Sequence, residues 1–340
     1  MGRIEVSLSR LVLLLAAAAF PLLSAATEHR SILCPDGHAT CFSGEPVTLR
    51  LMLHDPTSQS GTLAWAYSAQ RHTLAAGEIQ VIFDPSKPAQ VEIPLKGPEV
   101  REGVIYDTQF RARLVGRHGE ARAEFRRVFW IFPRNPFADR RQWLQRLNIA
   151  VYDPGGKTLT TLLDAKVPCT RIRSLETQSA GVIVIGEGVR LSGSLTETMT
   201  RLAAAGATVL CLSPADTSLP FPGTGDGSPA ASRIALCQAD IIHELDKRLD
   251  IEGWSAKGDA VSTRLRPEAF RGQVSLRPTE ATQGWPWIDV GYPSGGRLII
   301  CGFGIIRCWD AGPTPRYLLL RILESTDRAE KSTLSLSSPE

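Results

Sequence analysis

The stretch Val182–Val189, VIVIGEGV, decides the fold of the second half of this chain. Four apolar residues run without a polar interruption, and the chain then turns through Gly186-Glu187-Gly188 before a segment with helical spacing. A continuous apolar strand of this kind is typical of a parallel sheet that is covered on both faces. Its carboxyl end is where open α/β sheets bind ligands. The turn therefore either carries chemistry or only connects a strand to a helix.

The same alternation of strand and helix continues on both sides of that stretch. The pattern predicts strands over 147–153, 169–175, 180–189 and 207–214, and helices over 157–167, 195–207, 231–249 and 314–325. Near the end, residues 285–305 read as a hairpin that turns at Pro293-Ser294-Gly295-Gly296. These elements predict an α/β domain over 147–326, with a parallel sheet and helices on both of its faces.

The residues before this domain predict a different architecture. In the segment EPVTLRLML, apolar side chains recur at period two, and several similar short segments follow with Gly, Pro, Asp or Ser between them. This spacing predicts an all-β sandwich over 28–133, which resembles immunoglobulin-like or fibronectin type III-like modules at the level of pattern. Pro133 and Pro136 mark 134–146 as a linker, and the polar residues 327–340 read as a disordered tail.

Length and composition place the chain among ordinary globular proteins of about two domains. It has 340 residues, 43% of them hydrophobic and 21% charged, with a net charge of +3. This charge gives no support for nucleic-acid binding. Six arginines between 111 and 127 are either a strip that binds polyanions or the solvated face of a hairpin, and the second interpretation is favoured.

The first 26 residues predict export. Two arginines precede the apolar segment LVLLLAAAAFPLL, and small residues close it, which is the layout of a secretory signal peptide. We therefore expect a secreted or periplasmic protein that has no stable membrane insertion after cleavage. Of the seven cysteines, Cys34 and Cys41 bracket a turn-forming segment and are candidates for a disulfide.

The order of elements from Leu147 to Glu324 resembles the class I glutamine amidotransferase-like domain, which has a flavodoxin-like fold. The resemblance is carried by Asp153 after the first strand, by GVIVIGEG, by the helix and strand AAGATVLCLSP and by the late strand RLIICGFGII. Such domains also occur as non-catalytic modules beside β-sandwiches in secreted bacterial proteins related to carbohydrate processing. The resemblance thus implies an exported accessory or binding protein.

The positions that carry amidotransferase chemistry have changed in this chain. The resemblance places Ser213 at the nucleophile position, and Pro214 follows without the N–H that commonly stabilises an oxyanion. Gly304 and Ile306 stand where active members have a His-x-Glu pair, and neither can relay a proton. We therefore expect a pseudoenzyme. The alternative is an exported hydrolase with Ser213 or Cys211 as its nucleophile at the end of the fourth strand.

Aromatic and acidic residues supply the candidates for ligand binding. Tryptophan faces stack on sugar rings, and a nearby carboxylate binds the hydroxyl groups. The alternative for Trp285, Trp287 and Trp309 is packing in the core or at a domain interface. For Glu187 the alternative is a solvated side chain or a capping role. No cofactor or metal is expected, and the expected partner is a carbohydrate or another exported protein. The ligand-binding candidates are Glu187, Trp285, Trp287, Trp309 and Asp310.

Overall fold

The computed structural model describes residues 31–336, except 36, 38, 58, 85, 177–180, 216–218, 221–228, 251–253, 255–259 and 271–272. The predicted signal peptide lies outside the described residues. The chain is mostly β and contains several sheets, one of which is mixed and includes parallel strands. None of the described helices combines the length and apolar character that a membrane crossing needs.

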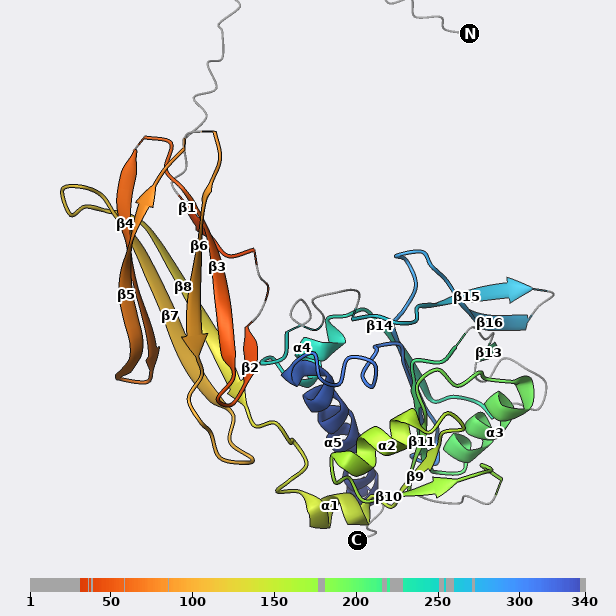
Figure 1. The fold of residues 1–340 in the computed structure, drawn as a ribbon. Helices are drawn as coiled ribbons and strands as arrows, with labels where there is room; N and C mark the ends of the chain where they lie inside the picture. Colours follow the sequence, from red (N-terminus) through yellow and green to blue (C-terminus); the bar gives the residue numbers. More distant parts are fainter. Residues whose placement is uncertain are drawn as a thin grey trace, which may run out of the picture.

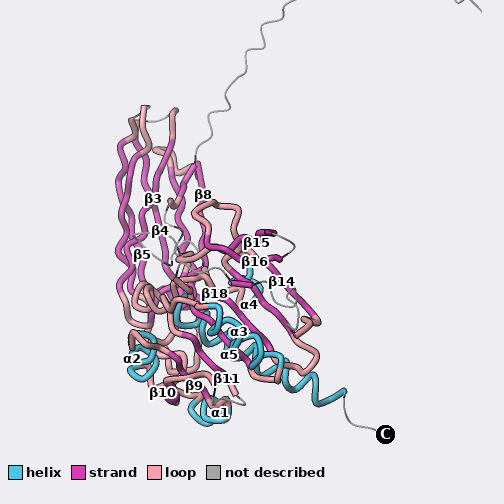
Figure 2. Tube along the Cα trace, turned by 90° about the vertical axis from the view of Figure 1, so that its right-hand side faces the viewer, coloured by secondary structure: helices cyan, strands magenta, loops and turns pink. Residues whose placement is uncertain are grey.

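The first eight strands form two sheets that share one core (Figure 1). They are β1 (Ser31–Leu33), β2 (Thr40–Phe42), β3 (Pro46–His54), β4 (Ser60–Ala69), β5 (His72–Ile82), β6 (Ala89–Lys96), β7 (Tyr106–Val115) and β8 (Ala121–Phe132). One sheet has the order β1-β3-β6 and the other β2-β8-β7-β4-β5. All neighbours are antiparallel except β2 and β8. Figure 2 shows the long strands of this half side by side.

The period-two pattern explains the core between these sheets. Leu49, Leu51 and Leu53 on β3 are buried, while the residues between them are less covered. They belong to one apolar cluster with Leu63 on β4 and Phe110 on β7, which lie in the other sheet. Alternating side chains point to opposite faces of a strand, so the apolar set of each sheet meets that of its partner.

The second half is built on a seven-stranded sheet of order β10-β9-β11-β12-β18-β17-β14. The first five strands are mutually parallel, β17 runs antiparallel to β18, and β14 runs antiparallel to β17 at the edge of the sheet. The strands are β9 (Ile149–Tyr152), β10 (Cys169–Ile172), β11 (Val182–Ile185), β12 (Thr208–Leu212), β14 (Arg233–Cys237), β17 (Trp287–Gly291) and β18 (Arg297–Cys301). A small sheet of order β13-β16-β15 comprises β13 (Leu219–Pro220), β15 (Leu265–Phe270) and β16 (Gln273–Pro278).

Helices cover both faces of the large sheet (Figure 1). They are α1 (Arg141–Arg146), α2 (Lys157–Asp164), α3 (Gly193–Ala204), α4 (Ile241–Leu245) and α5 (Pro313–Leu336). Val182 and Val184 of β11 lie in one core cluster with residues of α2 and α5, whereas Ile183 and Ile185 lie in a second cluster with residues of α3. The stretch VIVIGEGV is thus a strand buried on both faces, as its apolar run predicts.

Two expectations about secondary structure were wrong. Residues 231–249 form β14 and the short α4 in place of one helix, because β14 pairs with β17 from Arg233 to Cys237 and these tertiary hydrogen bonds override the helical pattern. The helix α5 continues to Leu336, so it includes most of the residues expected to form a disordered tail.

The two halves are in direct contact at the end of β8. The ring of Phe132 lies 4.5 Å from that of Tyr317 on α5, and the Tyr317 hydroxyl donates to the carbonyl oxygen of Pro133 at 3.1 Å. The backbone N–H of Ala39 donates to Asp250 at 2.7 Å. Burial of these rings and the hydrogen bonds across the contact fix the position of the linker next to α5.

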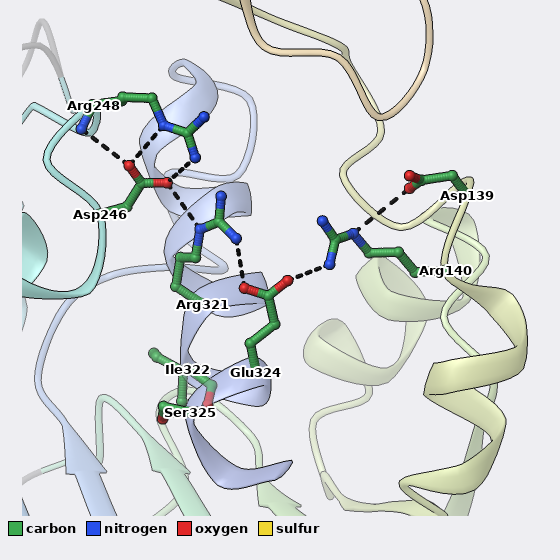
Figure 3. Close-up of polar contacts among 8 residues, drawn as sticks. All are labelled: Asp139, Arg140, Asp246, Arg248, Arg321, Ile322, Glu324 and Ser325. Carbon is green, nitrogen blue, oxygen red and sulfur yellow. Dashed lines mark hydrogen bonds and ion pairs between the residues drawn. The ribbon is translucent and has the colours of Figure 1, made fainter. Parts of the chain in front are cut away.

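A chain of ion pairs holds the side of α5 that faces α1 and α4 (Figure 3). Arg321 binds Asp246 at 2.8 Å and Glu324 at 2.5 Å; the Asp246 side chain is buried and that of Glu324 is partly buried. Because several charges act together at partly buried positions, this network contributes more than isolated surface pairs would. The complete series is Asp139, Arg140, Glu324, Arg321, Asp246 and Arg248.

Candidate functional site

The turn Gly186-Glu187-Gly188 lies at the carboxyl end of β11 and forms hydrogen bonds with three neighbouring segments of the chain. The N–H of Glu187 donates to the Thr158 hydroxyl on α2 at 3.0 Å, and the N–H of Gly188 donates to the carbonyl of Ser213 at 2.9 Å. The Glu187 carboxylate accepts from the N–H of Ile306 at 2.8 Å and that of Arg307 at 3.2 Å. The turn therefore connects the segments that follow β9, β12 and β18.

Burial raises the pKa of Glu187, and this effect outweighs the hydrogen bonds from Ile306 and Arg307 that favour the charged form. Both carboxylate oxygens accept from backbone N–H groups of this chain. Gly186 is required here, because a Cβ on it would lie 2.8 Å from the Asp153 carboxyl carbon. The opening stretch thus ends in a turn whose glutamate caps the turn after β18.

Ser213 follows β12 and has a strained backbone conformation. Its φ is 30°, in the left-handed region, and the residue is 4% exposed. The Thr263 hydroxyl donates its one proton to the carbonyl of Pro214 at 2.9 Å, so the Ser213 hydroxyl donates to Thr263 across 3.1 Å. Among the described residues, no histidine or carboxylate is a hydrogen-bond partner of this hydroxyl.

Cys211 is the other nucleophile considered from the sequence. It lies on β12, inside the core cluster that includes α3, and is completely buried. Burial raises the pKa of its thiol far above the ordinary value. Because the thiolate is the reactive form, the thiol of Cys211 is inert in this fold.

The three tryptophans do not gather at one site. Trp287 is 1% exposed and belongs to the core cluster on the α5 face. Trp285 is partly buried against the cluster on the α3 face. Only Trp309, together with Asp310, lines the large cleft described next.

A cleft of about 1080 Å³ lies between α2, the linker after β8 and the turn after β18. Lys157, Thr161 and Asp164 are spaced at i, i+4 and i+7 along α2, so they share one face of the helix and form one wall of the cleft. This polar face opposes the buried Leu162 and was not recognised from the sequence, although its spacing was visible there. The lining residues include Arg134, Lys157, Thr161, Asp164, Arg307, Trp309, Asp310 and Arg316.

The opposite wall of the cleft is fixed around Trp309. Its ring stacks on Phe137 with an interplanar angle of 3° and a centroid distance of 6.3 Å. Arg316 lies 5.5 Å from the Trp309 ring, donates to the Trp309 carbonyl at 2.8 Å and pairs with Asp310 at 2.5 Å. These contacts hold an aromatic ring at the edge of a polar cleft.

The cysteines differ from the sequence expectation. The sulfurs of Cys34 and Cys41 are not joined to each other in the structure, so the predicted disulfide is not formed there. Cys34 follows β1 and its sulfur accepts a hydrogen bond from Arg127 at 2.9 Å, whereas Cys41 is buried on β2 in the other sheet. The two side chains therefore lie in different environments. Within the described part of the chain, no three His, Cys, Asp or Glu side chains are arranged to hold a metal ion.

Comparisons with known proteins leave the family open, since no protein-family model and no curated protein matches the chain. Among solved structures, a Paenibacillus cycloisomaltooligosaccharide glucanotransferase is similar at a TM-score of 0.27 and 10% identity, over 74% of this chain and 35% of that one. A glycosyl hydrolase family 2 member from Bacteroides cellulosilyticus gives 0.23 and 15%, over 54% and 24%. A putative β-galactosidase from Bacteroides fragilis gives 0.24 and 11%, over 53% and 28%. The chain thus spans about a third or less of these structures, and such scores establish neither fold nor function.

Proposed function

We propose that the chain is an exported, non-catalytic binding protein whose second half is a degenerate class I amidotransferase-like domain. The order of the parallel strands supports the flavodoxin-like part of this proposal. Numbered along the chain, β9, β10, β11, β12 and β18 lie in the order 2-1-3-4-5, which is the flavodoxin-like order. The two antiparallel sheets of the first half support an immunoglobulin-like sandwich.

The hydrogen bonds of Ser213 are the observation that carries the non-catalytic assignment. An activated serine needs a base that accepts its proton, and the base needs a second group to orient it. Here the proton of Ser213 goes to Thr263, and that of Thr263 goes to a backbone carbonyl. A hydroxyl and a carbonyl are far too weak as bases for this role. The strained elbow is therefore a remnant of the scaffold.

The cleft beside Trp309 supports carbohydrate as the ligand. An aromatic face buries the apolar C–H face of a sugar ring, while polar groups at the edge bind its hydroxyls. Trp309 supplies the aromatic group on one wall, and Thr161 and Asp164 supply hydroxyl and carboxylate groups on the other. A volume of about 1080 Å³ is enough for an oligosaccharide.

An array of neutral and acidic oligosaccharides, probed with the full mature chain, tests this proposal. We expect retention on a subset of glycans, its loss in Trp309→Ala, and its persistence in Trp285→Ala, which removes a tryptophan outside the cleft. Thermal unfolding of both variants checks that they are folded. Equal retention by Trp309→Ala and the wild type would contradict the cleft as the binding site, and glycan cleavage during the assay would favour the hydrolase.

A further inference from the structure

A shallow hollow of about 310 Å³ lies on the five-stranded sheet of the first half, over β4, β7 and β8. Alternate residues of a strand share one face, and Phe110, Ala112 and Leu114 of β7 belong to the core. The charged side chains that line the hollow therefore lie on the opposite, outer face of the sheet. They form two rows across the strands with the alanines of β4: Ala66, Arg111 and Arg126 in one, and Ala64, Arg113 and Glu124 in the other.

Arg111 and Arg126 place two like charges directly opposite each other on neighbouring strands. The Cα atoms of such a pair are about 5 Å apart, and like charges in this position destabilise a sheet. The Arg111 guanidinium donates to the neutral side-chain oxygen of Gln109 at 2.9 Å, and within the described part of the chain it pairs with no carboxylate. The stability of the sheet therefore does not explain this pair of arginines, whereas an anionic ligand would compensate it.

The one carboxylate in the hollow neutralises only part of its charge. One oxygen of Glu124 pairs with Arg113 at 2.7 Å, and the other lies 3.5 Å from Arg126. Both arginine side chains remain more than half exposed. Glu78 on β5 lies beyond Ala64 in the second row and bounds the hollow on that side. The lining thus contains three guanidinium groups and one carboxylate, and its net charge is +2.

Other arginines of the same segment serve the fold itself. Arg122 is only 12% exposed and pairs with Asp55 and Glu120. Arg127 donates to the sulfur of Cys34 at 2.9 Å. The basic series from 111 to 127 is therefore no continuous strip for a long polyanion. Its available positive charge is concentrated in the hollow, which has the size of a site for one anionic group.

We propose that this hollow binds the dianionic phosphate group of a phosphate monoester, with Arg111 and Arg126 donating to its oxygens. Such a group carries a charge of about −1.5 to −2 at neutral pH and three strong acceptor oxygens, which match the charge of the hollow and the planar guanidinium groups. A carboxylate or a sulfate ester carries one charge and would leave the hollow partly uncompensated. The proposal goes beyond the saccharide cleft and does not depend on it.

Titration of the full mature chain with three matched sugars tests the proposal: glucose 6-phosphate, glucose 6-sulfate and glucose. The side-chain NMR signals of the arginines report which of them the ligand contacts. We expect glucose 6-phosphate to bind at least about tenfold more tightly than glucose 6-sulfate, and glucose to leave the signals of Arg111 and Arg126 unchanged. Because the second pKa of a phosphate monoester is about 6, the preference over the sulfate ester should disappear near pH 5.

Matched variants locate the binding. Arg111→Gln should lose about tenfold in affinity for glucose 6-phosphate, whereas Arg117→Gln removes the same charge from an exposed residue outside the hollow and should keep it. Trp309→Ala should also keep it, which separates this site from the saccharide cleft. Thermal unfolding checks that each variant is folded.

Four results would each overturn the proposal. They are no binding of glucose 6-phosphate, equal affinity for the phosphate and sulfate esters at neutral pH, unchanged affinity in Arg111→Gln, and loss of binding in Trp309→Ala. The first three leave the saccharide cleft standing, and the fourth would assign the phosphate ester to that cleft. Retention of neutral glycans by the cleft is measured separately, so the two sites fail or succeed independently.

Discussion

The carboxylate of Glu187 and the backbone N–H of Ile306 are joined by a hydrogen bond of 2.8 Å between residues 119 positions apart in the chain. This bond fixes the turn after β18 against the turn after β11. The same turn after β18 carries Trp309 and Arg307 into the cleft. Glu187 therefore serves the proposed ligand site by positioning one of its walls.

The titration of Glu187 predicts a pH dependence of stability. Because burial raises its pKa in the folded state, the folded chain holds this proton more strongly than the unfolded chain. The contribution of this group is therefore most favourable below the ordinary pKa and declines as the pH rises through the raised value. Urea unfolding across the acid range should show this decline in the wild type and a flatter profile in Glu187→Gln. The same decline in Glu187→Gln would contradict this assignment.

The ion-pair chain of Figure 3 predicts a large effect for Asp246→Asn. Burial alone would raise the pKa of Asp246, but hydrogen bonds from Arg248 and the charges of Arg321 and Arg248 outweigh it, so the pKa is lowered. Loss of the carboxylate leaves Arg321 without a partner on that side, at a cost of about 3 kcal/mol. The control Asp164→Asn, which changes an exposed residue, should be nearly neutral.

The sign of this second pH dependence is opposite to that of Glu187. A lowered pKa means that the stabilisation by Asp246 is complete above its ordinary pKa and is lost as the pH falls through the lowered value. The difference in unfolding free energy between wild type and Asp246→Asn should therefore shrink in strong acid. A difference that is independent of pH would contradict the ion-pair account.

Alanine substitutions at two glycines near Asp153 are expected to differ in their effect on stability. Gly186→Ala would place its Cβ 2.8 Å from the Asp153 carboxyl carbon, so neighbouring atoms must move, and we expect a loss of about 2 kcal/mol. Gly155→Ala meets the same aspartate only at 3.6 Å and should change stability little. Chemical unfolding of the two variants measures both effects. Equal losses of unfolding free energy would contradict the importance of the close contact between residue 186 and Asp153.

Reactivity distinguishes the pseudoenzyme from the hydrolase. A fluorophosphonate and a thiol alkylator, followed by mass-spectrometric mapping, should leave Ser213 and Cys211 unmodified in the folded chain. Ser213 has no base among its described hydrogen-bond partners, and burial keeps the Cys211 thiol protonated. Unfolding should expose Cys211 to alkylation, which controls for reagent activity. Selective labelling of Ser213 in the folded state would revive the hydrolase.

Local patterns in the sequence predicted the elements whose burial is regular. The run Val182–Ile185 and the alternation of leucines on β3 each encode which faces are covered, and that information needs no distant partner. The segment 231–249 failed because its strand depends on pairing with β17, about 55 residues away. The pattern of apolar residues could not show this pairing.

The candidate site was less predictable for the same reason. Glu187, Trp309 and Asp310 were singled out by residue type, but the bond from Glu187 to Ile306 and the separation of Trp285 from Trp309 depend on the packed sheet. The polar face of Lys157, Thr161 and Asp164 becomes the wall of a cleft only because the turn after β18 lies opposite it. Helical spacing identifies such a face in the sequence, but only the tertiary structure shows which residues lie opposite it.

The central claim is that the cleft between α2 and Trp309 binds saccharide, and a matched pair of tyrosine substitutions tests it most directly. Thr161→Tyr places a ring in the cleft, whereas Thr160→Tyr places one on the exposed side of the same helix. Calorimetric titration with an oligosaccharide that the wild type binds should show at least about a tenfold loss of affinity in Thr161→Tyr and none in Thr160→Tyr. Equal affinity in both folded variants would contradict the cleft as the binding site.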